Sequence, residues 1–360
     1  MNDILCIIDT LGFGGGAERQ MAGLAGMLHQ KGYNVTLATY HKHDMNPWLE
    51  KKYGIKSIML NCNNSQWDKF KAVRSFIKNG KFKTVIAYKD GAAMISCLCK
   101  ITGLRFKLVV SERNTTTALT RYERRKFLLY KVADVIVPNS YSQGVFITKH
   151  YPRLSKKVNV ITNFTDTEEF TPPVVGPNYE SVLNVLITAR IAPQKNILPF
   201  MHVVRRLKED KIRVRFNWYG GVYYGKDEYG SKVMEEYNKL DIGDYLEFHT
   251  PTMSIADVYR ECDAFCLPSL YEGYPNVVCE AMSCGKPILC SRVCDNSKIV
   301  EDGINGFLFD PTDENDMYRV ISVFCTYSRK QIEEMGKKSR EIAEKKFSMD
   351  SFVSNYMKII

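Results

Sequence analysis

The sequence has 360 residues, of which 45% are hydrophobic and 25% charged, so it can form two globular domains that each bury a core. Its 11 cysteines are an odd number without paired C-x-x-C spacing, which argues against a disulfide scaffold and a zinc site. No apolar run reaches the roughly 18 residues that a membrane-spanning helix needs.

The formal net charge of +10 is unevenly distributed along the chain. Residues 1–175 carry 26 Lys or Arg against 13 Asp or Glu, whereas residues 176–360 carry 24 against 27. The basic half is therefore expected to face an anionic partner such as the surface of a membrane. Nucleic acid is disfavoured because no aromatic platform or binding motif accompanies the charge. The N-terminus lacks the basic region of a secretory signal, so we expect a cytoplasmic protein, with any membrane contact peripheral and on the inner face of the cytoplasmic membrane.

Short apolar runs alternate with amphipathic stretches along the chain, which is the rhythm of βαβ units. In the first half we expect a helix over about 17–31 and strands over 4–8, 35–40, 84–88, 108–111 and 135–138. In the second half we expect strands over 183–188, 213–219, 245–249, 264–268 and 287–291. The predicted fold class is α/β, with two doubly wound Rossmann-like domains.

A stretch rich in proline, 171–178, separates the two halves and suits neither a helix nor an inner strand. We therefore expect a first domain over 1–172, a linker over 173–180 and a second domain over 181–342. The remaining residues, 343–360, have apolar side chains at helical spacing, and we expect a C-terminal helix that can pack back on the first domain.

A glycine-rich segment, 12–16, follows the first predicted strand and opens a helix. It loosely matches the G-x-G-x-x-A fingerprint of dinucleotide-binding enzymes, in which a second-strand acidic residue holds the ribose. Here the second strand ends in Tyr40 and His41, so a dehydrogenase loses its key residue. Gly15 and Gly16 can instead bring backbone N–H groups close to a phosphate or an acceptor. Glu18 is interpreted as a partner of the helix dipole.

Two further segments of the first half carry polar side chains. Glu112, Arg113 and Asn114 end a predicted strand and can meet a substrate, although a Glu–Arg ion pair at the strand end would look the same. The stretch 120–131 is basic and aromatic, so it can lie at a bilayer interface and attract a polyprenyl diphosphate. An ordinary surface helix with solvated arginines fits that stretch equally well.

The segment 270–287 carries the clearest chemical pattern. Gly273 and Pro275 place Glu272 in a loop after a strand, whereas Glu280 falls in the helix that follows. The carboxyl ends of strands are where open α/β sheets bind ligands, and a helix N-terminus offers N–H groups to a phosphate. Carboxylates also accept hydrogen bonds from the hydroxyls of a sugar.

Arg190 and Lys195 follow another predicted strand as a pair of cations. Breaking a sugar–diphosphate bond develops negative charge that a metal or fixed cations must neutralise. Because the sequence contains no Asp-x-Asp, we expect these cations to do so without a metal and without a further cofactor. An ordinary exposed basic pair would look the same were it not for the segment from Glu272 to Glu280.

The sequence E-G-Y-P-N-V-V-C-E, residues 272–280, resembles the E-x7-E motif of the family 4 retaining glycosyltransferases. Segments 188–196, 160–172 and 303–308 are similar to that family's diphosphate-gripping loop, its interdomain segment and its G-x-N-G-F-L turn. The resemblance covers nearly the whole chain and implies the GT-B fold, in which two doubly wound domains face a cleft. The S-E-R-N sequence, 111–114, resembles enzymes that build capsule, O-antigen and lipid-linked oligosaccharides.

The resemblance implies a role for each site residue. Arg190 and Lys195 would neutralise the donor diphosphate, and Glu272 would hold hydroxyls of the donor sugar, so these three are the catalytic candidates. The implied donor-binding residues are Gly15, Gly16, Arg190, Lys195, Glu272, Gly273, Tyr274, Pro275, Asn276, Val277 and Glu280. The implied acceptor-binding residues are Glu112, Arg113 and Asn114.

The resulting hypothesis is a retaining, metal-independent transferase that moves a hexose or N-acetylhexosamine from a nucleotide diphosphate-sugar, UDP-linked, to a glycan acceptor. The implied acceptor is lipid-linked, as in cell-surface polysaccharide biosynthesis. A UDP-sugar 2-epimerase of the same fold and a non-catalytic sugar-nucleotide or lipid-binding module remain the alternatives.

Overall fold

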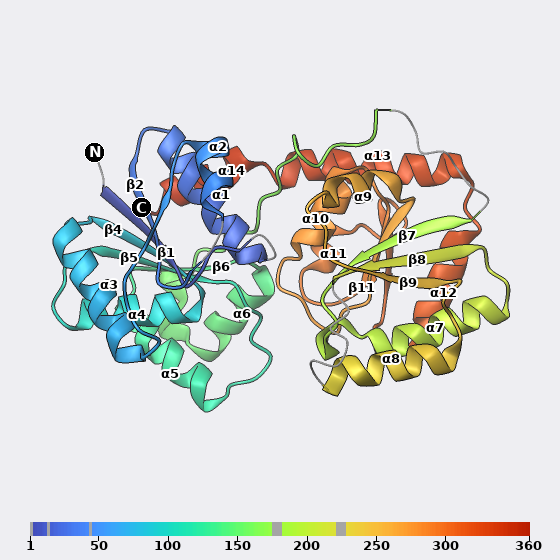
Figure 1. Ribbon diagram of the computed structural model, residues 1–360, viewed down its shortest axis with the longest axis horizontal. Helices are drawn as coiled ribbons and strands as arrows, with labels where there is room; N and C mark the ends of the chain where they lie inside the picture. The colour runs from blue at the N-terminus through green and yellow to red at the C-terminus, as the bar shows by residue number, and fades with distance from the viewer. Residues whose placement is uncertain (1–2, 13–14, 43–44, 175–181, 221–227) are drawn as a thin grey trace. The chain divides into compact units, whose positions relative to one another are not determined.

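The computed structural model describes residues 3–12, 15–42, 45–174, 182–220 and 228–360 (Figure 1). It divides into two compact units. Unit 1 consists of Met1–Asn163 together with Met349–Ile360, and unit 2 of Phe164–Ser348. The last residues of the chain therefore belong to the same unit as the first. Residues 175–180 of the expected linker lie outside the described part of the chain.

Unit 1 is built on a parallel sheet of six strands in the order β3-β2-β1-β4-β5-β6. These strands are β1 (Asp3–Ile8), β2 (Asn34–Thr39), β3 (Ser57–Met59), β4 (Thr84–Tyr88), β5 (Lys107–Glu112) and β6 (Val135–Pro138). The helices are α1 (Gly16–Gln30), α2 (Asn46–Tyr53), α3 (Gln66–Gly80), α4 (Lys89–Ile101), α5 (Arg121–Leu129), α6 (Tyr141–His150) and α14 (Met349–Met357), with 3₁₀ turns η1 (Tyr130–Val132) and η2 (Pro152–Lys157). Helix α14 packs against α1.

Unit 2 repeats this architecture with a parallel sheet in the order β12-β11-β10-β7-β8-β9. Its strands are β7 (Leu183–Thr188), β8 (Val214–Tyr219), β9 (Leu246–His249), β10 (Ala264–Leu267), β11 (Ile288–Ser291) and β12 (Gly306–Phe309). Its helices are α7 (Ile197–Glu209), α8 (Glu228–Leu240), α9 (Ile255–Glu261), α10 (Asn276–Ser283), α11 (Asn296–Ile299), α12 (Glu314–Cys325) and α13 (Arg329–Lys346), with the 3₁₀ turn η3 (Pro193–Lys195).

The central strands explain why apolar runs revealed the sheets. Every residue of β4 and of β10 is buried, because helices cover both faces of a parallel sheet and leave no side of a central strand in water. Each unit consequently has its own hydrophobic core on its own sheet. The prediction of two doubly wound α/β domains is confirmed.

The sequence missed two edge strands. β3 has only three residues, and two of them are exposed, so it lacks an apolar run. The segment that resembled a turn, 303–308, forms a turn only at its start, with Gly303 at a φ of 78°, and then enters β12. Gly306 is needed there because a Cβ at this position would lie 2.0 Å from the carbonyl oxygen of Ile288.

In the part of the chain that the structure describes, no helix is both long enough and apolar enough to cross a bilayer.

Candidate functional site

The site in unit 2 lies at the point where the strand order of its sheet reverses. β7 and β10 are neighbours, and from them the strand order runs outward in opposite directions. In open α/β sheets such a switch point leaves a crevice beyond the carboxyl ends of the two strands, and ligands bind there. Arg190 and Lys195 follow β7, and Glu272 follows β10. The fold therefore brings the two predicted segments to one place.

Lys195 and Glu272 form an ion pair in this crevice. The Lys195 Nζ lies 2.5 Å from Glu272 Oε1, and the two side chains are only 13% and 10% exposed. Removing two charges from water costs desolvation free energy, and this cost offsets much of the attraction between them. The structure therefore holds a cation and a carboxylate side by side, largely shielded from water.

Backbone contacts hold the two loops together. Leu270 N donates to Gln194 O at 2.8 Å, and Gln194 Nε2 donates to Tyr271 O at 2.8 Å. Asn196, which follows Lys195, takes a left-handed conformation with a φ of 59°, and its buried side chain donates to Pro311 O at 2.7 Å. These contacts fix the backbone on either side of Lys195.

Arg190 is presented differently. It is exposed, and its guanidinium makes no hydrogen bond or ion pair with any residue that the structure describes. The backbone beside it is tightly held, because Trp218 Nε1 donates to Ala189 O at 2.7 Å. A Cβ on Gly220 would lie 1.8 Å from the same oxygen, so only glycine fits there. Arg190 is thus a cation without a partner among the described residues, and the backbone beside it is rigid.

Glu280 lies on α10 and is 5% exposed. The Tyr259 hydroxyl donates to Glu280 Oε2 at 3.1 Å and is itself hydrogen bonded to Thr188 Oγ1 at 2.9 Å. Thr188 is the last residue of β7. A polar chain therefore links the helix carboxylate to the strand that precedes Arg190, and Tyr259 was not found from the sequence because it lies on α9, far from either motif.

The start of α10 has the predicted geometry. The helix begins at Asn276 directly after Pro275, which makes no side-chain capping hydrogen bond. Gly273 and Val277 are partly exposed on either side of this start, whereas Tyr274 is 7% exposed and packs edge-on against Phe347. Backbone N–H groups at a helix start can bind a phosphate, and this helix follows the loop that carries Glu272, the partner of Lys195.

In unit 1, the glycine-rich segment meets an ion-pair cluster. Gly15 caps α1 and Gly16 begins it; Phe13 and Gly14 lie outside the described residues. Glu18 does lie in the first turn of α1, as predicted for a helix-dipole partner, but its carboxylate also binds Lys89 Nζ at 2.5 Å. Lys89 binds Asp9 as well, at 3.1 Å. No pattern in the sequence indicates that these three charges meet.

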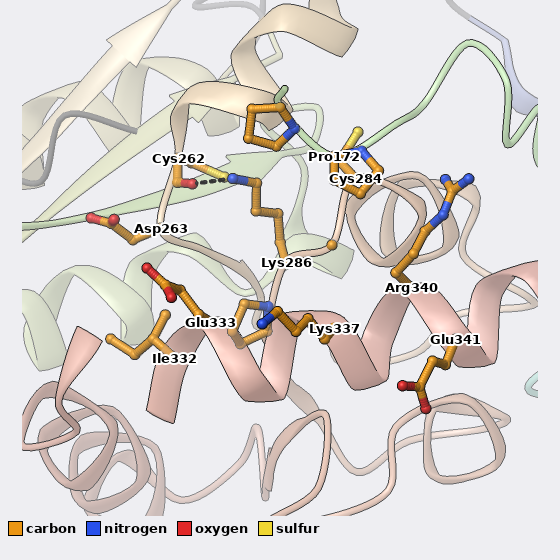
Figure 2. Close-up of a pocket in the computed structure, with 13 residues that line it drawn as sticks. Pro172, Cys262, Asp263, Cys284, Lys286, Ile332, Glu333, Lys337, Arg340 and Glu341 are labelled. Carbon is orange, nitrogen blue, oxygen red and sulfur yellow. Dashed lines mark hydrogen bonds between the residues drawn. The ribbon is translucent and has the colours of Figure 1, made fainter. Parts of the chain in front are cut away.

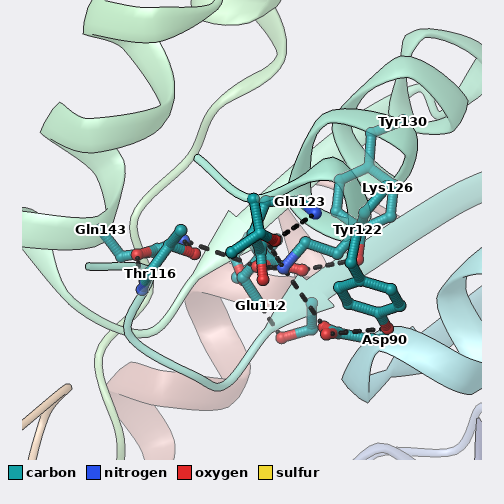
Figure 3. A network of polar contacts seen from close by, with 11 residues as sticks. Asp90, Glu112, Thr116, Tyr122, Glu123, Lys126, Tyr130 and Gln143 are labelled. Carbon is teal, nitrogen blue, oxygen red and sulfur yellow. Dashed lines mark hydrogen bonds and ion pairs between the residues drawn. The ribbon is translucent and has the colours of Figure 1, made fainter. Parts of the chain in front are cut away.

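Glu112 does not pair with the neighbouring arginine. It is fully buried, and its carboxylate accepts from Lys126 Nζ at 2.8 Å and from the Tyr130 hydroxyl at 2.5 Å (Figure 3). Burial raises the pKa of Glu112 to about 7, although Lys126 acts against this rise. The carboxylate thus points into unit 1, and the alternative interpretation, an ion pair between Glu112 and Arg113, is wrong.

Lys126 is the centre of that network. It lies on α5 with 1% of its side chain exposed, and it also contacts Asp90 at 3.5 Å and Glu123 at 2.8 Å (Figure 3). Burial alone would lower the pKa of Lys126, but the carboxylates of Glu112 and Asp90 raise it above the ordinary value. One cation is therefore surrounded by three carboxylates.

Arg113 turns to the other side of β5. Its Nη1 donates to Asn163 Oδ1 at 2.8 Å, and its Nη2 donates to the hydroxyls of Tyr88 and Tyr356, the latter at 3.1 Å. Tyr356 belongs to α14, so this guanidinium ties the C-terminal helix to the sheet of unit 1. Asn114 alone of the three predicted acceptor residues is exposed. Their acceptor role stays a prediction.

Helix α5 has one face in the core and one in water. Lys126 and Phe127 are buried, and the exposed residues are Arg121, Tyr122, Arg124, Arg125 and Leu128. The basic stretch 120–131 is thus a surface helix whose outer face mixes arginines with two large apolar side chains.

A separate cavity of about 530 Å³ lies at the opposite, amino-terminal edge of the sheet in unit 2 (Figure 2). Cys262 precedes β10 and Lys286 precedes β11, and both line the cavity together with Lys337 of α13. The ammonium of Lys286 donates to Arg260 O at 2.8 Å and to Cys262 O at 2.7 Å. It therefore stabilises the end of α9, and none of the predicted site residues lines this cavity.

Comparison with known proteins finds similarity to one family and to several relatives. Residues 183–326 match the family described as Glycosyl transferases group 1. The chain is 23% identical over 351 residues to an uncharacterized glycosyltransferase of Haemophilus influenzae, covering 96% of each chain. It is 28% identical over 166 residues to the UDP-Gal:alpha-D-GlcNAc-diphosphoundecaprenol alpha-1,3-galactosyltransferase of Escherichia coli, covering 44% of this chain and 42% of that one.

The fold is also found among solved structures. The crystal structure of Anabaena HepE in complex with UDP-glucose superposes with a TM-score of 0.85 at 18% identity, covering 99% of this chain and 98% of that one. The expectation of the GT-B fold is confirmed at the level of the fold.

Proposed function

We propose that this chain, a glycosyltransferase whose residues 183–326 belong to the glycosyl transferases group 1 family, is a retaining enzyme that uses a UDP-sugar without a metal. The transferred group is a hexose or an N-acetylhexosamine. The acceptor is a lipid-linked glycan in the synthesis of a cell-surface polysaccharide. The observation that carries the proposal is the Lys195–Glu272 pair at the switch point of unit 2, beside the start of α10.

The donor fits this site group by group. Its diphosphate meets Arg190, which has no partner among the described residues, together with Lys195 and the N–H groups at the start of α10. These fixed positive charges stabilise the charge that develops on the leaving diphosphate. The carboxylate of Glu272 accepts hydrogen bonds from hydroxyls of the donor sugar, and Glu280 accepts from the ribose.

Donor binding changes the partner of Lys195. In this structure its ammonium lies on Glu272, and a diphosphate brings a stronger acceptor with two or more negative charges. Lys195 then moves to the phosphate and frees a Glu272 oxygen for the sugar. The ion pair thus holds both groups in place until the donor arrives.

The choice of UDP and of a lipid-linked acceptor is supported by the relatives. The name of the Escherichia coli enzyme includes a UDP-galactose donor and a diphosphoundecaprenol acceptor, and Anabaena HepE was crystallised with UDP-glucose. The exposed face of α5, with its arginines, Tyr122 and Leu128, suits peripheral contact with an anionic bilayer.

A donor screen tests the proposal. The protein is incubated separately with UDP-GlcNAc, UDP-GalNAc, UDP-Gal, UDP-Glc and GDP-Man, with and without EDTA, and released nucleotide is measured. We expect release from one UDP-sugar and no loss of rate in EDTA. Products are then followed by NMR: an α-linked product from the α-linked donor supports retention, whereas an epimerised UDP-sugar formed without acceptor would identify a 2-epimerase instead. Release from none of the donors would contradict the proposal.

A further inference from the structure

Unit 1 has a switch point of its own. In its sheet β1 and β4 are neighbours, and the strand order runs outward from them in opposite directions. Asp9 directly follows β1, and Lys89 directly follows β4 as the first residue of α4. The crevice expected at this point therefore has charged side chains at its base.

Three charged groups form a compact cluster there, which we call the Lys89 cluster: Asp9, Glu18 and Lys89. The Lys89 Nζ lies 3.1 Å from Asp9 Oδ1 and 2.5 Å from Glu18 Oε1. Their side chains are 33%, 11% and 26% exposed in the order Asp9, Glu18, Lys89, so the cluster is open to solvent on one side. An ammonium has three N–H donors, and the cluster uses two of them.

The backbone is strained where it places Lys89. Its φ is 65°, in the left-handed region that residues other than glycine seldom enter because it is sterically unfavourable. Ligands bind at this edge of the sheet, so we infer that the strain is retained because it places the Lys89 side chain there.

The position of the Glu18 carboxylate depends on Gly15. A Cβ at this position would lie 1.9 Å from Glu18 Oε2, so only glycine lets the Glu18 carboxylate fold back over the start of α1. Burial acts to lower the pKa of Lys89, but Glu18 and Asp9 raise it, so the ammonium stays charged at neutral pH.

The charge and the donor pattern of the cluster select a ligand. Two carboxylates against one ammonium give a net charge of about −1, which repels phosphate. Carboxylate oxygens that accept and an N–H that donates, side by side, match the hydroxyls of a neutral sugar. We propose that Asp9, Glu18 and Lys89 form the subsite that binds the neutral sugar of the glycosyl acceptor through its hydroxyl groups.

This inference rests on the proposed function, since an acceptor exists only if the chain is a transferase. Donor hydrolysis supplies a readout that separates the two. Release of UDP is measured with water as the sole acceptor, and again with octyl glycosides of glucose, galactose, N-acetylglucosamine and N-acetylgalactosamine as neutral probes. We expect at least one glycoside to accelerate UDP release from the wild-type protein.

The test variant is Lys89→Gly, which removes the ammonium while glycine accepts the backbone conformation without strain. Lys81→Gly is the matched control, because Lys81 also has a positive φ, 51°, but is an exposed residue at the end of α3. We expect Lys89→Gly to reduce the acceleration by the glycoside at least tenfold and to keep its affinity for UDP, measured by calorimetry, within twofold. Lys81→Gly should retain the acceleration.

Asp9→Asn keeps the shape of the cluster and is the second test variant if Lys89→Gly proves unstable in thermal melts. We expect Asp9→Asn to weaken the acceleration by the glycoside severalfold. Full acceleration in Lys89→Gly or in a folded Asp9→Asn would overturn the proposal. So would a wild-type protein that hydrolyses a donor but responds to none of the glycosides. A wild-type protein that hydrolyses no donor would contradict the proposed function itself, and the subsite with it.

Discussion

Lys195 and Glu272 lie 77 residues apart in the chain, yet the Nζ of one is 2.5 Å from the Oε1 of the other at the switch point of unit 2. Neither motif shows this contact by itself. It arises because β7 and β10 are neighbours in the sheet, so that the loops after them share one crevice. The cation assigned to the diphosphate and the carboxylate assigned to the sugar are therefore partners in this structure.

Removing the carboxylate tests the role assigned to Glu272. Glu272→Gln keeps the size of the side chain but weakens its hydrogen bonds to sugar hydroxyls, and it leaves Lys195 without its partner. We expect kcat/KM for the donor to fall about 100-fold, equivalent to about 2.7 kcal/mol of transition-state stabilisation. Glu334→Gln, on the exposed face of α13, is the control and should keep the wild-type rate. An equal rate in the two variants would show that Glu272 does not hold the donor.

The backbone contact under Arg190 can be tested through stability. Gly220→Ala would place a Cβ 1.8 Å from Ala189 O, so the ends of β7 and β8 would have to separate. We expect a loss of about 3 kcal/mol or more in the free energy of unfolding, measured with urea. Gly32→Ala, where a Cβ meets nothing within 4 Å but φ is 86°, should cost only about 1 kcal/mol. Similar losses in the two variants would contradict the close approach at Gly220.

The buried carboxylate in unit 1 predicts a dependence of stability on pH. The pKa of Glu112 is raised to about 7 in the folded protein, against about 4.3 for an ordinary glutamate, so the folded state binds this proton more tightly. The stability from this group is present below about pH 4 and is lost as the pH rises through about 7. We expect the free energy of unfolding to fall by on the order of 2 kcal/mol across that window.

Glu112→Gln should remove most of this slope, because the amide does not titrate. Glu123→Gln removes another carboxylate from the same lysine while leaving Glu112 in place, and it should keep the slope. The measurement is urea unfolding at a series of pH values. If Glu112→Gln and the wild type have parallel profiles, the proton is not bound at Glu112.

The C-terminal helix should depend on Arg113. Tyr356→Phe removes one hydroxyl that contacts both the guanidinium and Tyr88, and it leaves the ring in the core. We expect a loss of about 1 to 2 kcal/mol and faster hydrogen exchange in α14. Lys31→Ala removes the exposed ion pair with Asp350 on the same helix and should cost less than about 1 kcal/mol. Equal exchange rates in both variants would contradict the role given to Arg113.

The fold and one site could be predicted because their signals are local. Buried parallel strands appear in the sequence as apolar runs, which predict the fold. Gly273 and Pro275 exclude a continuous helix between Glu272 and Glu280, which predicts the loop of the site. The strands β3 and β12 were not predicted because both are short edge strands, and β3 is partly exposed.

The polar partners could not be predicted, because they depend on which strands are neighbours. Glu112 pairs with Lys126 and not with the adjacent Arg113, which lies just beyond the end of β5 and donates to Asn163 instead. The meeting of Asp9 with Lys89 likewise requires the pairing of β1 with β4. The pattern of a single segment carries no information on such pairs.

The central claim is that the switch point of unit 2, and not the cavity at the other edge of the same sheet, binds the nucleotide of the donor. Calorimetric titration of UDP into the wild-type protein and two lysine variants tests it most directly. Lys195→Ala removes a cation from the crevice, and Lys337→Ala removes one from the 530 Å³ cavity. The account predicts at least tenfold weaker UDP binding in Lys195→Ala and unchanged binding in Lys337→Ala. Unchanged binding in Lys195→Ala, or an equal loss in both variants, would contradict it.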